Sequence, residues 1–280
     1  MLVAERIEAR RNDLRPAERR VAEVVLTDPE AVAFGTVAGL AARAGTSGAT
    51  VVRLAARLGY DGFVALQTGV QDELARRLRP AIERIRQPPA GDVVGQTLAV
   101  ESDNLHGTLE VVDRAAFTAA VQLIAGVTGR VFVVSGDASH GIADLLASEL
   151  GMLRPDVTLV AGSELRIART IAHAGHADAA VAIDIRRYDR WVLDTASRLA
   201  RLGVKVVAVT DSTLSPLASH ATISFVVSAV GVGPFDSQVG TLALANALVS
   251  GVAGALQSSA TARLDRVEAA WSEAGALVEP

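Results

Sequence analysis

The sequence has 280 residues, half of them hydrophobic, so it is long enough for one large or two modest domains with a buried core. It contains no cysteine, which excludes disulfides, thiolate catalysis and cysteine-ligated zinc. No run approaches the roughly 18–20 uninterrupted apolar residues that span a membrane, and residues 1–11 lack the apolar core of a signal peptide, so we expect a cytoplasmic protein with no membrane partner.

Charge is distributed unevenly along the chain. The net charge is −4, yet residues 1–90 carry 14 arginines against 11 acidic residues, and the excess of acidic residues lies in the remainder. A mildly basic first part joined to an acidic second part suits a DNA-reading head on a larger sensing body. Because the head is only weakly basic, we expect two copies to bind DNA together.

The first 78 residues predict a compact helical bundle. Pro16 pre-sets the first turn of a helix with a buried valine stripe, and Asp28-Pro29 opens a short helix that leads to Phe34. Residues 61–78 read as a further helix with apolar residues at helical spacing.

Residues 36–63 predict a helix-turn-helix. Thr36 is a good N-cap for the first helix, Gly45 suits the sharp turn, and Ser47 begins the second helix. Gly59 is suited to a left-handed C-terminal cap. The second helix carries a clean apolar stripe made of Val51, Leu54, Ala55 and Leu58.

The outer face of this second helix is the candidate DNA-reading surface. Ala49, Arg53 and Ala56 lie opposite the apolar stripe, with Thr50 and Arg57 beside them. Small residues permit close approach to a groove, arginines reach guanine edges or phosphates, and a threonine can donate to a phosphate. Taken alone, an ordinary solvent face of a helical hairpin fits equally well. The candidate DNA-binding residues are Thr36, Ser47, Ala49, Thr50, Arg53 and Arg57.

The helical pattern stops near residues 87–91, where Pro88-Pro89 and Gly91 interrupt it. We predict a helix-turn-helix domain over residues 1–86, a linker over 87–95 and a second domain over 96–275.

The second domain predicts a doubly wound parallel sheet. After helices over residues 93–112 and 113–127, short β-rich runs alternate with helical patterns. This alternation is typical of a five-stranded parallel sheet with helices on both faces, which binds ligands beyond the carboxyl ends of its strands. The expected strands are 131–134, 157–160, 179–185, 204–210 and 222–227.

The first strand-to-helix junction is SGDASHG, residues 135–141. Gly136 permits a tight turn, Ser139 suits a helix cap, and free amides there would accept an anion. An ordinary capped turn explains these residues as well, since neither a Walker A motif nor the full G-x-G-x-x-G spacing is present. Thr210 and Ser212 follow the fourth strand and suit either a polyol ligand or turn chemistry.

The helical head with TVAGLAARAGTSGATVVRLAARLGYDGF, joined to this sheet, resembles the RpiR family of bacterial transcriptional regulators. The most specific part is S-x-A-T-V-V-R followed by LGYDGF, matched from Ser47 to Phe63. The resemblance implies a dimeric or tetrameric repressor or activator of carbon-metabolism genes. It also implies an α/β SIS (sugar isomerase) domain that senses a phosphosugar or related small anionic metabolite.

The third strand departs from the family's phosphosugar pattern. The sequence there is AVAIDIRRYDR, so Asp184 stands where the resemblance places a phosphate-binding serine. A carboxylate repels a phosphate unless it is protonated or neutralised. Arg186, Arg187 and Arg190 either neutralise it, grip an anion directly, or pair with nearby aspartates. The candidate effector residues are Ser135, Gly136, Ser139, His140, Asp184, Arg186, Arg187, Thr210 and Ser212.

A sugar-phosphate isomerase with an accessory helical domain is the alternative function. Isomerisation needs a carboxylate or histidine base, and the candidates are His140, Glu149, His173, His176 and His220. They form no catalytic constellation, so we predict no enzyme, no cofactor and no metal. A SIS regulator that acts on another protein is a third possibility. Helices over residues 236–256 and 261–275 are candidates for contacts between subunits.

Overall fold

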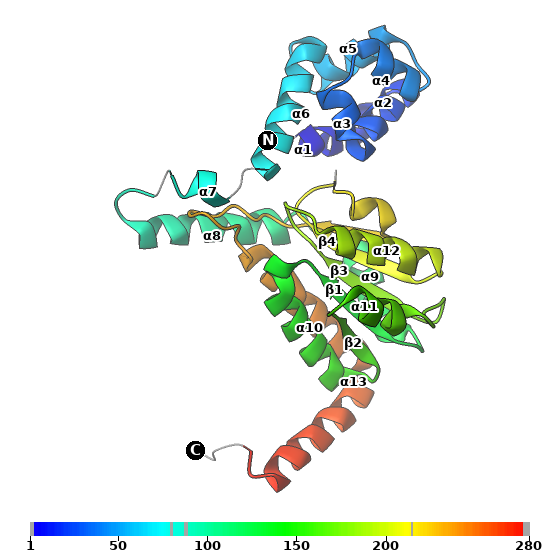
Figure 1. The fold of residues 1–280 in the computed structure, drawn as a ribbon, viewed down its shortest axis with the longest axis vertical. Coiled ribbons are helices and arrows are strands. Elements are labelled where there is room, and N and C mark those ends of the chain that lie inside the picture. Colours follow the sequence, from blue (N-terminus) through cyan, green and yellow to red (C-terminus); the bar gives the residue numbers. More distant parts are fainter. Residues whose placement is uncertain (1–2, 79–80, 87–88, 214, 277–280) are drawn as a thin grey trace. The chain divides into compact units, whose positions relative to one another are not determined.

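The computed structural model describes residues 3–78, 81–86, 89–213 and 215–276. The chain divides into two compact units (Figure 1). One is built mainly from residues 1–87, whose described elements are all helices, and also includes the segment 212–219. The other is built around a β-sheet, as the sequence predicts.

The helical unit follows the predicted pattern. Asp28 accepts a hydrogen bond from the Ala31 amide at the start of α3, and the Glu18 carboxylate accepts one from the Arg15 amide at the start of α2. The helices are α1 (Val3–Ala9), η1 (Arg11–Asp13), α2 (Pro16–Thr27), α3 (Pro29–Ala33), α4 (Val37–Arg43), α5 (Gly48–Arg57), α6 (Gly62–Leu78) and α7 (Ala81–Arg84).

The helix-turn-helix consists of α4 and α5. Gly45 in the turn has φ 56° and Gly59 after α5 has φ 83°, both left-handed values that favour glycine. The expected apolar stripe of α5 is fully buried, and α5 packs against α2, α4 and α6. The core of the unit includes Val21, Val25, Leu40, Val51, Leu54, Leu58 and Leu66.

The sheet unit contains five parallel strands in the order β2-β1-β3-β4-β5. Each lies within two residues of its predicted limits: β1 (Val131–Ser135), β2 (Val157–Val160), β3 (Ala179–Ile183), β4 (Lys205–Thr210) and β5 (Ile223–Val226). The helices are α8 (Val93–Leu109), α9 (Arg114–Gly126), η2 (Asp137–Ser139), α10 (His140–Leu153), α11 (Glu164–Ile171), α12 (Arg190–Arg201), η3 (Ala218–His220) and α13 (Val239–Glu273).

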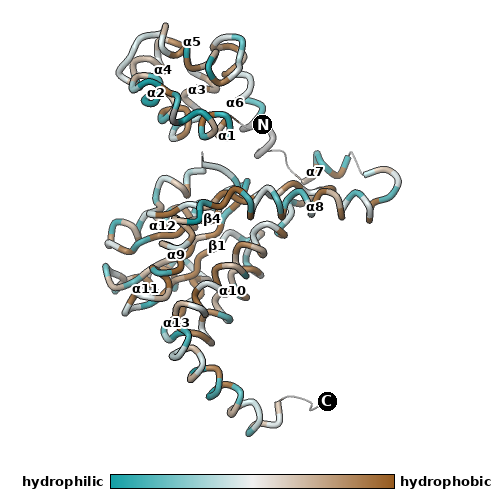
Figure 2. The backbone as a smooth tube through the Cα atoms, turned by 180° about the vertical axis from the view of Figure 1, so that it is seen from behind, coloured by the Kyte–Doolittle hydropathy of each residue, from teal (hydrophilic) through white to brown (hydrophobic). Residues whose placement is uncertain are grey.

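Helices cover both faces of the sheet. Along each strand alternate side chains point to opposite faces. Ser135, Ile183 and Val209 are register partners, and they share the face that packs on α9, α10 and α13. The other face is covered by α12, which contacts β1, β3 and β4. The strands are strongly hydrophobic along their length, as the colouring of β1 and β4 in Figure 2 shows.

The first and last helices of the sheet unit follow the sequence prediction closely. α8 begins at Val93, as the helix predicted over residues 93–112 does, so its first turn occupies the end of the predicted linker, and α8 packs on α13. The two helices expected over residues 236–256 and 261–275 lie within α13, and a non-helical backbone at Gln257 divides them. The described part of the chain contains one helix long and apolar enough to cross a membrane, and it is α13. Leu244, Leu248 and Val252 of α13 are buried against the sheet unit, which is what a core helix requires.

Candidate DNA-binding face and ligand site

The outer face of α5 presents one arginine between two small residues. Ala49, Arg53 and Ala56 are exposed, while Val51 and Leu54 on the opposite side are completely buried. The side chain of Arg53 therefore leaves the helical unit, and the alanines leave room for another surface to approach it. This geometry suits a helix that enters a DNA groove.

Thr50 does not belong to this exposed face, and the expectation that it does is wrong. Only 3% of Thr50 is exposed. Its Oγ1 accepts a hydrogen bond from Nη2 of Arg53 at 2.9 Å and lies 3.2 Å from Oγ of Ser47. Because α5 packs against three neighbouring helices, burial extends beyond the narrow apolar stripe and covers Thr50.

Arg57 is tied to the helical unit. Its Nε lies 3.2 Å from the carboxylate of Glu18, whose side chain is almost fully buried, and its Nη1 donates to the carbonyl oxygen of Asp13. Thr36 caps α4, because its Oγ1 accepts from the Gly39 amide at 3.1 Å. Both residues are exposed in part, but their side chains already make hydrogen bonds within the helical unit.

In the sheet unit, the loop after β1 uses most of its own amides. The Gly136 amide donates to the carbonyl oxygen of Ile183, and the Ser139 amide donates to that of Gly136. The Asp137 amide donates to Oδ2 of Asp189 at 2.9 Å. The expectation of free anion-binding amides at these three positions is therefore wrong, because the chain's own carboxylate and carbonyl groups occupy them.

The two serines of this loop differ in their surroundings. Ser135 is 2% exposed, and its Oγ has no hydrogen-bond partner among the described residues. Ser139 is buried, and its Oγ donates to Oε1 of Gln238 at the start of α13. His140 begins α10 and is exposed. Ser135 thus has an unused hydroxyl at the carboxyl end of β1.

Asp184 is buried directly after β3. Its Oδ2 accepts from the Asp189 amide at 2.7 Å, and a Cβ on Gly136 would lie only 2.4 Å from its Oδ1. Burial raises the pKa of Asp184 to about 7, and the negative charges of Asp189 and Asp211 add to that rise, while backbone hydrogen bonds from Asp189 and Ile185 oppose it. Part of the population is therefore protonated near neutral pH.

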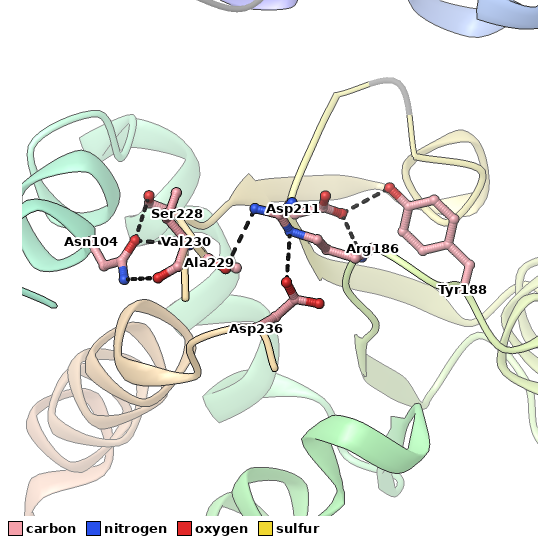
Figure 3. Close-up of polar contacts among 8 residues, drawn as sticks. All are labelled: Asn104, Arg186, Tyr188, Asp211, Ser228, Ala229, Val230 and Asp236. Carbon is pink, nitrogen blue, oxygen red and sulfur yellow. Dashed lines mark hydrogen bonds and ion pairs between the residues drawn. The ribbon is translucent and has the colours of Figure 1, made fainter. Parts of the chain in front are cut away.

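Arg186 does not neutralise Asp184. Its Nε lies 3.3 Å from Oδ1 of Asp236, and its Nη2 donates to the carbonyl oxygen of Ala229 at 3.5 Å (Figure 3). Its amide donates to Asp211, which also accepts from the Tyr188 hydroxyl at 2.8 Å. Of the alternatives for Arg186, neutralisation of Asp184 and pairing with the aspartates nearby in sequence are both excluded, because Asp236 in the loop before α13 supplies the carboxylate.

Asn104 of α8 anchors the loop before α13, and sequence reasoning missed this role, because its partners Ser228 and Val230 lie more than 120 residues away along the chain. Its Oδ1 accepts from the Ser228 hydroxyl at 2.8 Å and from the Val230 amide at 3.1 Å, and its Nδ2 donates to the Val230 carbonyl oxygen at 2.8 Å (Figure 3). Asn104 is 1% exposed.

The remaining predicted effector residues are dispersed. Arg187 and Arg190 are exposed. Thr210 is fully buried, and by the strand register it lies on the sheet face opposite to Ser135. The carbonyl oxygen of Ser212 accepts a hydrogen bond from the Ser215 amide in a turn. The structure thus brings Gly136 and Asp184 together, whereas Ser135 and Thr210 lie on opposite faces of the sheet.

The candidate catalytic residues do not converge. His140 lies at the carboxyl edge of the sheet, whereas His173 and His176 precede β3 at the amino edge. His176 also lines an open groove of about 750 Å³ at that amino edge, together with Lys205 and Thr222. Among the described residues, no three histidine, aspartate or glutamate side chains group in a way that suits a metal ion.

Comparison with known proteins agrees with these two units. Residues 1–77 match the helix-turn-helix domain of the rpiR family, and residues 127–251 match the SIS domain. The chain belongs to the RpiR family. The HTH-type transcriptional regulator HexR of Pseudomonas aeruginosa is 29% identical over 231 residues, which cover 78% of this chain and 76% of HexR.

Two solved structures resemble this RpiR-family chain. The sugar isomerase domain of an RpiR transcription factor from Sphaerobacter thermophilus is 28% identical, with a TM-score of 0.60, and covers 64% of this chain and 99% of its own. The NanR protein of Vibrio vulnificus, complexed with ManNAc-6P, is 21% identical, with a TM-score of 0.57, and shares the fold over 97% of this chain and 98% of its own. The RpiR-family chain is a DNA-binding transcriptional regulator with a SIS domain.

Proposed function

We propose that this regulator reads operator DNA with α5 and that its SIS domain binds a small anionic metabolite related to a phosphosugar. The protein works as a homodimer or homotetramer in the cytoplasm, where its DNA lies. A ligand changes DNA binding only through unequal affinity for two arrangements of the protein. Regulation is favoured over isomerisation, because His140 at the carboxyl edge of the sheet is separated from His173 and His176 at the amino edge.

The observation that carries the DNA proposal is the exposed guanidinium of Arg53 between Ala49 and Ala56. Arginine can donate to O6 and N7 of guanine in the major groove, and flanking alanines permit the helix to approach the base edges. Ser47 is exposed at the N-terminus of α5, where its hydroxyl could donate a hydrogen bond to a phosphate oxygen.

The DNA proposal is tested with fragments from the region upstream of the protein's own gene. We expect Arg53→Ala to lower affinity for the bound fragment by about 10- to 100-fold, the range for one lost arginine–guanine contact. Arg11→Ala is the matched control, since Arg11 is an exposed arginine of the same unit that pairs with Glu8. Equal affinities of the two variants would contradict the proposal.

The ligand proposal rests on the cationic side chains that follow β3. Arg187 and Arg190 are exposed next to the start of α12, and they have no ion pair with another described residue. The unused Ser135 hydroxyl adds a hydrogen-bonding group at the same edge of the sheet. A bidentate arginine favours phosphate or carboxylate. The relative NanR, which shares the fold, carries a sugar phosphate.

The ligand proposal is tested by the thermal shift that inorganic phosphate, sugar phosphates and small carboxylic acids produce. We expect the double variant Arg187→Ala/Arg190→Ala to lose the shift given by the wild-type protein. Arg201→Ala removes an exposed arginine from the far end of α12 and serves as the control. A full shift in the double variant would show that these arginines do not hold the ligand.

A further inference from the structure

A short chain of hydrogen bonds runs along the first turns of α5. Oγ of Ser47 lies 3.2 Å from Oγ1 of Thr50, and Nη2 of Arg53 lies 2.9 Å from the same Oγ1. The outer two residues are exposed, whereas only 3% of Thr50 is exposed. A buried hydroxyl thus links two side chains that face solvent.

The directions of these hydrogen bonds follow from the chemistry of the groups. A guanidinium has donors only, so Thr50 Oγ1 must accept from Arg53. The single hydroxyl hydrogen of Thr50 is then free to donate to Oγ of Ser47. The Ser47 hydroxyl in turn keeps its own hydrogen, at the N-terminus of α5, where phosphate groups bind favourably.

The hydrogen bond from Arg53 leaves most of that guanidinium available. Arginine carries five N–H donors, and Thr50 takes one of them, so four remain for a base and its neighbours. A free arginine side chain loses rotamer entropy when it is held in one geometry. A side chain that is already held by Thr50 loses less of it on binding.

We propose that Thr50 is a positioning residue for DNA recognition. Its buried hydroxyl holds the Arg53 guanidinium in the orientation that reads a base, and it directs the Ser47 hydroxyl toward the adjacent phosphate. This inference rests on the proposed DNA-reading role of α5. Arg57 has no part in the device, because Glu18 and Asp13 hold it.

The test uses the full-length protein with Thr50→Val and Thr50→Ser. The probes are DNA sites that the wild-type protein selects from a random-sequence library, together with unselected DNA. We expect Thr50→Val, which keeps the shape and loses the hydroxyl, to lower the ratio of specific to non-specific affinity by about 10-fold or more. The slope of log affinity against log salt should stay unchanged, because no phosphate-neutralising charge is removed.

The conservative variant separates positioning from folding. Thr50→Ser keeps the hydroxyl, so we expect it to keep the specificity ratio, with circular dichroism confirming that both variants are folded. Ser47→Ala changes an exposed position and leaves Thr50 and Arg53 unaltered. It should weaken specific and unselected binding by the same factor, and it gives this readout even if Thr50→Val does not fold.

Each outcome decides a different statement. A wild-type protein that selects no sequence overturns the DNA proposal and the role of Thr50 with it. If the wild type selects a site and Thr50→Val discriminates equally well, the positioning role alone is overturned. The positioning role is also overturned if Thr50→Ser loses discrimination as Thr50→Val does, or if Ser47→Ala changes the ratio of specific to non-specific affinity.

Discussion

The two arginines on the outer side of α5 stand in different surroundings. Arg57 compensates the carboxylate of Glu18, of which only 1% is exposed, while the one hydrogen bond of Arg53 within the described residues goes to the Thr50 hydroxyl. A buried carboxylate that loses its partner carries a large desolvation cost. Arg57 therefore stabilises the bundle, and Arg53 is available for an external ligand.

We expect Arg57→Ala to destabilise the helical unit by about 1–3 kcal/mol, the usual cost of an unsatisfied buried polar group. Hydrogen exchange of the α2 and α5 amides measures this effect directly. Arg53→Ala, an equivalent truncation on the same helix, should leave the exchange rates unchanged. Adding Glu18→Gln to Arg57→Ala should recover part of the lost stability. Equal exchange in the two arginine variants would disprove the structural role of Arg57.

Asp184 makes the stability of the sheet unit depend on pH. Its folded pKa of about 7 lies above the ordinary value of 3.8, so the folded state binds more protons than the unfolded state between these limits. Its contribution is complete below about pH 4 and is lost as the pH rises through 7. The full span corresponds to about 4 kcal/mol.

We expect Asp184→Asn, which mimics the protonated carboxyl, to reduce the difference in unfolding free energy between pH 5 and pH 8. Urea unfolding followed by Trp191 and Trp271 fluorescence reports on this unit, since both tryptophans lie in it. Asp144→Asn, at an exposed position of α10, is the control. A difference that persists in full in the Asp184 variant would contradict the assignment.

At the scale of elements, the start of α13 packs closely against α8. A Cβ on Gly240 would lie 2.4 Å from Oγ1 of Thr108 and 2.7 Å from the Ser228 carbonyl oxygen, distances that no side chain tolerates. Thr108 also accepts the Ser228 amide at 2.9 Å. The absence of a side chain at Gly240 therefore lets α8, the loop after β5 and α13 meet.

We expect Gly240→Ala to destabilise the sheet unit by about 1–3 kcal/mol through overpacking. Gly254→Ala, in the same helix, meets no atom within 4 Å and should stabilise the protein by about 0.5–1 kcal/mol, because alanine favours a helix over glycine. Urea unfolding by tryptophan fluorescence compares the two. Changes of opposite sign in the free energy of unfolding support the close packing at Gly240. A Gly240→Ala variant with unchanged stability would refute it.

At the scale of the whole molecule, the weak basic charge of the first 90 residues favours the use of two heads on one operator. Two helix-turn-helix units of a dimer bind half-sites about one helical turn apart, which is about 10 base pairs. Insertion of five base pairs between the half-sites rotates one of them by half a turn. We expect this insertion to weaken binding more than an insertion of ten base pairs, in a gel-shift titration. Equal binding to both DNAs would mean that each head binds alone.

The sequence by itself determined the elements, because their signals are local. The apolar stripe of α5, Gly45 and Gly59 act within one helix-turn-helix, and hydrophobic runs located all five strands within two residues. The motif from Ser47 to Phe63 was sufficient to indicate the family. The same local signals also explain the exposure of Arg53, since it lies opposite the stripe.

The tertiary structure decided which polar groups meet. Glu18 reaches Arg57 across 39 residues, Asp189 reaches the Asp137 amide across 52, and Arg186 pairs with Asp236 instead of its sequence neighbours. Burial of Thr50 depends on three helices packing around α5. Periodicity describes one element at a time, whereas hydrogen bonds and ion pairs between elements depend on how those elements pack.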